Sequence, residues 1–174
     1  MLRIELSCAD GEPVEFFETV TLPAESGGHE VVDPGQAVLR GRVERVDSGY
    51  GVDASIEGSA KVRCARCLGA FQLSYMERFR LEFQPISQAP VEDERQLKPG
   101  ELDIRFYSDP VLDLVDLAAE QFQLALPMKP LCRDDCQGLC SRCGADLNRG
   151  RCACPANADP RWESLRSWRP GGAN

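Results

Sequence analysis

The chain has 174 residues, of which 43% are hydrophobic and 28% are charged, and its formal net charge is −8. This composition predicts a folded domain with a small appendage and argues against global disorder. An acidic chain repels a phosphate backbone, so a basic protein suits most of it better as a partner than nucleic acid does. No stretch approaches the roughly 20 apolar residues that span a bilayer, and the first residues do not resemble a secretory signal. We therefore expect a cytoplasmic protein with no membrane partner.

Alternation of apolar and polar residues predicts a mainly antiparallel sheet in the first two thirds of the chain. Strands are expected at 2–8, 14–22, 38–46, 52–63 and 71–83, with a further short strand at 102–107. Cys8 falls in the first strand and is expected to be buried as a small apolar residue. The segment 24–35 is rich in Gly, Ser and Pro, which indicates a loop. The polar, acidic segment 85–100 is expected to be an exposed loop.

A helix is predicted at 114–126, after the last strand. Asp113 has the position of an N-cap, and Asp116 suits the positive end of the helix dipole. The apolar residues recur at helical spacing, which favours packing against the sheet. Pro127 ends the helix.

The fold class predicted from these elements is α+β, a mainly antiparallel β-sheet with one packed helix. Residues 1–128 form this β-rich domain. Residues 129–174 form a cysteine-rich zinc-knuckle tail, expected to pack on the hairpin at 64–67. The tail is expected to end in a short helix at 159–168, where Pro160 follows the capping residue Asp159.

Nine cysteines in a reducing compartment indicate metal binding more than disulfides. Apart from Cys8, eight remain in closely spaced pairs, which equals two sets of the four ligands that structural zinc takes. The predicted metal ligands are Cys64, Cys67, Cys132, Cys136, Cys140, Cys143, Cys152 and Cys154. Gly144, which follows a C-x-x-C pair, permits the positive φ that a metal knuckle requires.

The eight cysteines can be divided in more than one way. In the favoured division the last four close one site locally, and Cys132 and Cys136 join Cys64 and Cys67 in a second site. The rival is a single site drawn from the six C-terminal cysteines, with Cys64 and Cys67 free. Iron–sulfur clusters also use four thiolates, but polar, arginine-bearing loops favour two structural zinc ions.

The sequence does not indicate an enzyme or a small-molecule substrate. A catalytic zinc keeps an open coordination position, often beside a histidine or carboxylate. The only histidine, His29, lies in a loop far from any cysteine. The alternative is a thiol redox or metal-handling enzyme, because redox proteins share the C-x-x-C pair. That reading needs a βαβ context, whereas Cys64 and Cys67 fall in a predicted β-hairpin.

Two motifs resemble a known family. The first is the CARCL run at 64–68, and the second extends from LPMKPLC at 126–132 through CQGLCSRCG and DLN to CAC and DPR. Together they resemble the YceD family of large ribosomal RNA subunit accumulation proteins. The resemblance implies a role in 23S rRNA synthesis, processing or stability, with 23S rRNA or a large-subunit ribosomal protein as partner. The metal assignment comes from the cysteines themselves.

Two modes of action are compatible with this resemblance. In the first, arginines near the cysteines contact RNA or another acidic surface. The candidates are Arg63, Arg66, Arg133, Arg142, Arg149, Arg151 and Arg161. In the second, the acidic sheet portion chaperones a basic ribosomal protein and affects the RNA indirectly.

Overall fold

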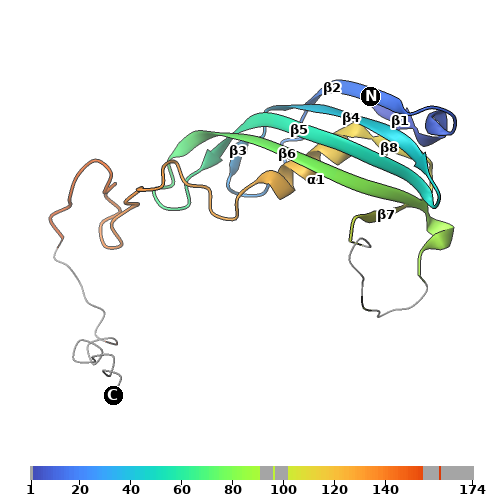
Figure 1. Ribbon diagram of the computed structural model, residues 1–174. Helices are drawn as coiled ribbons and strands as arrows, with labels where there is room; N and C mark the ends of the chain where they lie inside the picture. Colours follow the sequence, from blue (N-terminus) through green and yellow to red (C-terminus); the bar gives the residue numbers. More distant parts are fainter. Residues whose placement is uncertain (1, 91–95, 97–101, 155–160, 162–174) are drawn as a thin grey trace, which may run out of the picture.

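The computed structural model describes residues 2–90, 96, 102–154 and 161. The helix predicted at 159–168 and most of the acidic segment lie outside the described residues. Among the described residues the molecule has two regions, an arched sheet with a helix beneath it and an irregular tail at one end of the sheet (Figure 1). None of the helices formed by these residues has the length and apolar character needed to cross a membrane.

The larger sheet has six strands. They are β2 (Val14–Thr21), β3 (Val31–Asp33), β4 (Gln36–Val46), β5 (Gly49–Arg63), β6 (Ala70–Pro85) and β7 (Ile104–Tyr107). The strand order is β2-β4-β5-β6-β7, and β3 pairs with β5 beyond the end of β4. All neighbours are antiparallel except β6 and β7. The predicted mainly antiparallel sheet is therefore confirmed.

A second, two-stranded sheet pairs the start of the chain with the residues before the helix. It contains β1 (Arg3–Glu5) and β8 (Val111–Asp113), which are antiparallel. The 3-10 helix η1 (Leu6–Ala9) follows β1, and η2 (Ile86–Gln88) follows β6. Arg3 donates to the Asp113 carboxylate at 3.0 Å, which ties the two short strands together.

The helix α1 (Leu114–Ala125) forms where its capping residue predicts it. The Asp113 side chain accepts hydrogen bonds from the backbone N–H groups of Val115 and Asp116. This capping satisfies donors that have no partner inside the helix. The apolar face of α1 lies under the arch of the sheet (Figure 1), and Phe122 contacts Tyr75 of β6 with ring centroids 5.1 Å apart.

The core lies between α1 and the inner face of the sheet. Side chains alternate between the two faces of β4 and β5, and one set is buried. The largest fully buried side chains in β4 and β5 are Leu39, Val43, Val52, Ile56 and Val62. Antiparallel pairing places Leu39 opposite Ile56 and Val43 opposite Val52. The inner face therefore has the periodicity of two that the sequence predicts.

The N-terminal prediction was partly wrong. The strand predicted at 2–8 ends at Glu5, and Cys8 lies exposed in η1 instead of buried in a strand. Leu6 and Ala9 are both buried, and residues three apart share a face in a 3-10 turn but not in a strand. The predicted loop 24–35 also contains β3, which forms because β5 extends past the end of β4 and offers it a partner.

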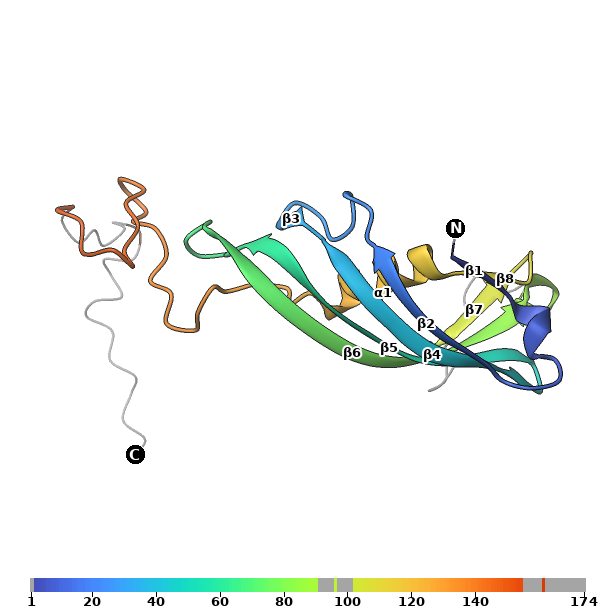
Figure 2. The same cartoon turned by 90° about the horizontal axis from the view of Figure 1, so that it is seen from above.

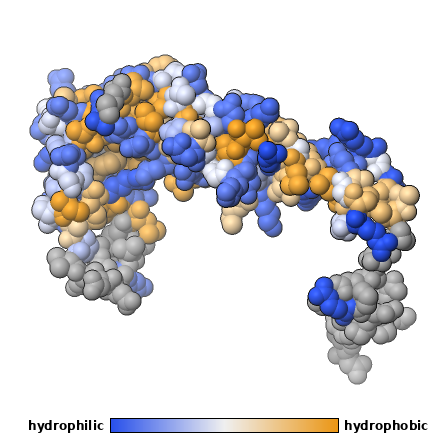
Figure 3. All heavy atoms as spheres, turned by 180° about the vertical axis from the view of Figure 1, so that it is seen from behind, coloured by the Kyte–Doolittle hydropathy of each residue, from blue (hydrophilic) through white to orange (hydrophobic). Residues whose placement is uncertain are grey.

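The tail follows α1 in the chain and lies beyond the tip of the β5–β6 hairpin (Figure 2). In its described part, from 129 to 154, only Pro130, Cys136 and Gly138 are buried. On the surface, apolar residues gather at the narrow region that joins the body to the tail (Figure 3). Leu124, near the end of α1, and Met128, just after it, are largely exposed. Between 129 and 154, therefore, the tail forms no apolar core of its own.

Candidate metal centres

The first pair of cysteines lies in the loop between β5 and β6. β5 ends at Arg63 and β6 begins at Ala70, so the loop carries both Cys64 and Cys67. Cys64 donates its backbone N–H to the Gly69 carbonyl at 2.9 Å, and its own carbonyl accepts from Leu68 at 2.9 Å. Leu68 has a φ of 60°, so the chain reverses sharply after Cys67. The C-x-x-C loop thus has the tight turn of a metal knuckle.

Eight sulfur atoms converge in two groups of four. Centre 1 comprises Cys64, Cys67, Cys132 and Cys136, and centre 2 comprises Cys140, Cys143, Cys152 and Cys154. Within each group the sulfur atoms all lie within 4.8 Å of one another. The single-site alternative requires Cys64 and Cys67 to lie apart from the C-terminal cysteines. In the structure they lie beside two of them, Cys132 and Cys136.

The sulfur separations in centre 1 fit a tetrahedral metal site. The Sγ atoms of Cys64 and Cys136 are 3.8 Å apart, as are those of Cys67 and Cys132. A zinc ion with bonds of about 2.3 Å to four sulfurs separates them by about 3.8 Å. A disulfide brings two sulfurs to about 2.05 Å, and all nine cysteines are free thiols. Each group can therefore hold one metal ion.

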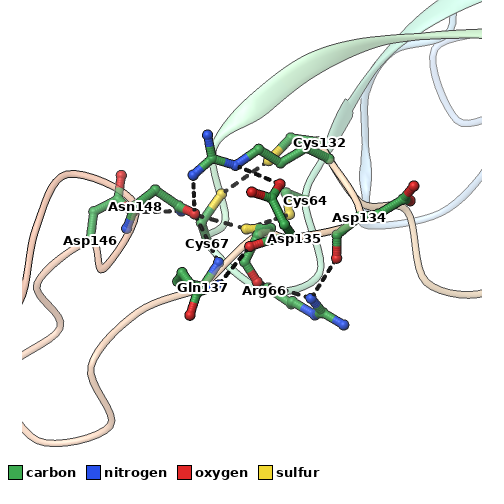
Figure 4. A network of polar contacts seen from close by, with 11 residues as sticks. Cys64, Arg66, Cys67, Cys132, Asp134, Asp135, Gln137, Asp146 and Asn148 are labelled. Carbon is green, nitrogen blue, oxygen red and sulfur yellow. Dashed lines mark hydrogen bonds and ion pairs between the residues drawn. The ribbon is translucent and has the colours of Figure 1, made fainter.

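Centre 1 joins the hairpin to the tail, and hydrogen bonds support it from both sides. Arg66 donates through Nη1 to the carbonyls of Asp134 at 3.0 Å and Cys136 at 2.9 Å (Figure 4). Ala65 donates its backbone N–H to the Pro130 carbonyl at 2.8 Å. Gly138 has a φ of 71°, and a Cβ there would lie 3.1 Å from the Arg66 carbonyl oxygen. Close backbone approach and a positive φ together require glycine at this position.

Centre 2 is built from one continuous stretch of the tail. Cys140 donates its backbone N–H to Ala145 at 2.8 Å and accepts from Gly144 at 2.9 Å. Gly144 has a φ of 71°, as the knuckle prediction requires. The backbone N–H of Arg142 points at the Cys140 sulfur at 3.5 Å. Centre 2 is more exposed than centre 1: none of its four cysteines is buried, whereas Cys64 and Cys136 of centre 1 are buried.

Both centres are electrostatically suited to a cation. Burial opposes ionisation of Cys64, but hydrogen bonds from backbone groups, including those of Cys67 and Cys132, outweigh it and lower its pKa to about 6. Backbone hydrogen bonds from Cys143 and Arg142 lower the pKa of Cys140 to about 6. Burial, together with the neighbouring sulfurs, raises the pKa of Cys132 to about 12, and the neighbouring sulfurs of centre 2 raise the pKa of Cys154 to about 12. Each centre thus combines a cysteine that ionises readily with one that ionises less readily than a free thiol. A metal ion stabilises further thiolates beside it.

The predicted contact arginines fall into two sets. Arg66 supports centre 1, Arg133 bonds to Asn148 and Asp135, and Arg149 pairs with Asp146 at 3.6 Å. The side chains of four others are exposed: Arg63, Arg142, Arg151 and Arg161. Within the described residues, the first three of these make no ion pair and no side-chain hydrogen bond.

Two features of the site were not predicted. The sequence analysis identified the DLN run only as part of a family motif, yet Asn148 contacts the sulfur of Cys136. The position of this run between Cys143 and Cys152 was the available signal. The second feature is that Arg66 donates to backbone carbonyls of the tail; its contact with a partner stays a prediction. His29 is exposed in its loop, as expected.

Comparison with known proteins identifies the family. The family model described as large ribosomal RNA subunit accumulation protein YceD matches residues 52–167. Uncharacterized proteins of Mycobacterium tuberculosis and Mycobacterium bovis are each 31% identical over 161 residues, covering 89% of this chain and 73% of theirs. An uncharacterized protein of Mycobacterium leprae is 27% identical over 110 residues, covering 61% of this chain and 46% of its own. No solved structure matches. The chain therefore belongs to the YceD family of large ribosomal RNA subunit accumulation proteins.

Proposed function

We propose that this protein is a cytoplasmic biogenesis factor of the large ribosomal subunit, needed for 23S rRNA synthesis, processing or stability. It acts as a non-catalytic binding module. Two structural zinc ions hold its tail, residues 129–174, on the tip of the β-rich domain, residues 1–128. The family description, which names large-subunit rRNA accumulation, supports the cellular role. The convergence of eight sulfurs in two groups of four carries the zinc part of the proposal.

The burial pattern of the tail favours structural metal. With three buried residues between 129 and 154, this part of the tail buries too little apolar surface to offset the entropy of ordering its backbone. Structural zinc supplies this missing free energy in small cysteine-rich segments. Four sulfurs complete a tetrahedral coordination sphere, so a metal ion at either centre would keep no position for substrate.

The hairpin location of the first C-x-x-C pair favours this reading over the redox alternative. Cys64 and Cys67 lie between two antiparallel strands and face two more thiols, Cys132 and Cys136. A thioredoxin-like pair sits in a βαβ context.

The free arginines of the tail support direct contact with RNA. Arg142 and Arg151 are exposed beside centre 2, where their charges can reach phosphates. Residues 129–174 contain eight basic and five acidic residues, although the whole chain has a net charge of −8. That overall acidity supports a second candidate function, in which the body chaperones a basic ribosomal protein.

Metal content tests the zinc part. Protein purified under reducing conditions should contain two zinc ions per chain by elemental analysis. Replacing Cys140 and Cys143 together by serine should leave one, because centre 2 loses half its ligands. Cys8→Ser is the matched control and should keep two, since Cys8 lies in η1 outside both centres. Wild-type protein without bound metal would exclude the zinc proposal.

Salt-dependent binding tests the RNA contact. A variant with Arg142→Gln and Arg151→Gln should bind 23S rRNA fragments more weakly than wild type. Its dependence on salt should also be shallower, by about 0.7–0.9 in the logarithmic slope per lost phosphate contact. Arg40→Gln with Arg45→Gln, on β4 of the body, is the charge-matched control. Equal RNA binding by wild type and tail variant would favour the basic-protein partner, which crosslinking in cells would identify.

A further inference from the structure

Asn148 belongs to one centre by sequence and to the other by contact. It lies between Cys143 and Cys152, in the loop whose two ends are ligands of centre 2. Its side chain, however, points into the group of residues around centre 1 (Figure 4). The adjacent Leu147 donates its backbone N–H to Gly138 at 2.9 Å, which holds the loop against the segment between the two centres.

The Asn148 amide has a partner for each of its polar atoms. Its Nδ2 donates to the Cys136 sulfur at 3.5 Å and to an Asp146 carboxylate oxygen at 2.7 Å. Its Oδ1 accepts from the Gln137 backbone N–H and from Arg133 Nη2, both at 2.8 Å. Four bonds therefore fix the orientation of this amide. They connect the loop of centre 2 to the segment that carries Cys136.

An N–H group that points at a ligand sulfur strengthens that ligand. It stabilises the thiolate and holds the sulfur in the direction that the metal needs, and removal of such outer partners costs about 10–100-fold in metal affinity. The bond forms only when the loop is ordered. A metal ion at centre 2 fixes both ends of the loop, so it removes part of the entropy that the Asn148 contacts would otherwise have to offset.

We propose that Asn148 is a positioning residue that couples the two centres, so that zinc binding at one raises the zinc affinity of the other. The coupling rests on the zinc centres of the proposed function and adds a relation between them. Because coupling free energy is reciprocal, loading centre 1 must favour centre 2 by the same factor. During zinc titration the tail should then populate the singly loaded form less than two independent centres would.

A comparison of zinc affinities measures this coupling. Competition with a chromophoric chelator gives the affinity of centre 1 alone in Cys140→Ser/Cys143→Ser, and of centre 2 alone in Cys64→Ser/Cys136→Ser. In the wild type, the constant for binding both ions should exceed the product of the two single constants by about 10-fold or more. With Asn148→Ala in all three proteins, the excess should fall to about one. Asn148→Asp has the same shape without the N–H donors and should also lose the excess.

The control is Gln137→Ala, which removes an exposed amide that bonds only to the Asp135 carbonyl, and it should keep the excess. Circular dichroism checks the sheet in every variant. Among the residues that the structure describes, the apolar core under the sheet contains none from the tail, so these variants should leave the sheet intact. An excess that survives in Asn148→Ala, or a wild type that binds two ions independently, would overturn the coupling while leaving the zinc proposal intact. A wild type that binds no zinc would overturn both.

Discussion

The body and the tail of this protein differ in the interactions that can stabilise each of them. The body buries a continuous set of apolar side chains between α1 and the inner face of the sheet. The tail has only three buried residues in its described part, yet it brings six sulfurs into two centres. One region is therefore stabilised by area removed from water, and the other is suited to stabilisation by metal–sulfur bonds. A condition that weakens one should leave the other largely intact.

Removal of metal should give the largest separation between the two regions. We expect a strong chelator to release the tail, because structural zinc contributes about 10–16 kcal/mol per ion in zinc-finger peptides at neutral pH. Hydrogen exchange should then rise sharply in residues 130–154 and stay slow in β4 and β5. Added zinc should restore protection. Unfolding of the sheet together with the tail would show that the two regions are one cooperative unit.

A core substitution should have the opposite effect. Phe122 is fully buried and contacts Tyr75, so Phe122→Ala should lower the free energy of unfolding of the body by about 3–5 kcal/mol. Zinc content should remain that of the wild type. Denaturant unfolding and elemental analysis on the same samples measure both quantities. Loss of metal in this variant would mean that docking of the tail depends on the packing of α1.

The helix cap offers a smaller effect that depends on pH. Burial opposes ionisation of Asp113, but bonds from Arg3 and from the backbone N–H groups of Asp116 and Val115 outweigh it and lower its pKa. A carboxyl group with a lowered folded-state pKa stabilises above its unfolded pKa, and this contribution is lost as the pH falls through the folded value. Asp113→Ala should cost about 1 kcal/mol at neutral pH.

The difference between Asp113→Ala and wild type should shrink as the pH falls below about 4, near the unfolded pKa of aspartate. Thermal unfolding at several pH values measures it. Glu12→Ala is the control, because Glu12 is exposed and lies between η1 and β2, outside the helix. A difference that stays constant from neutral to acidic pH would contradict the capping role.

Local patterns in the sequence were sufficient for the main elements of the body. Alternation places β2, β4, β5 and β6 within a few residues of their observed bounds, and the cap at Asp113 places the start of α1. These features depend on neighbours a few residues away, so they can be read from the chain. The short strands β3 and β8 depend on distant partners, which is why no local signal predicts them.

Cysteine spacing by itself determined that eight thiols suit two four-ligand centres, because residues two to four apart can share one metal ion. Only the tertiary structure decided which thiols meet. Cys64 and Cys136 are 72 residues apart, and they meet because the chain that follows α1 returns to the tip of the β5–β6 hairpin (Figure 1). The roles of Arg66 and Asn148 were likewise decided in three dimensions. Their partners are backbone carbonyls and a sulfur from other loops, and such contacts leave no periodic pattern in the chain.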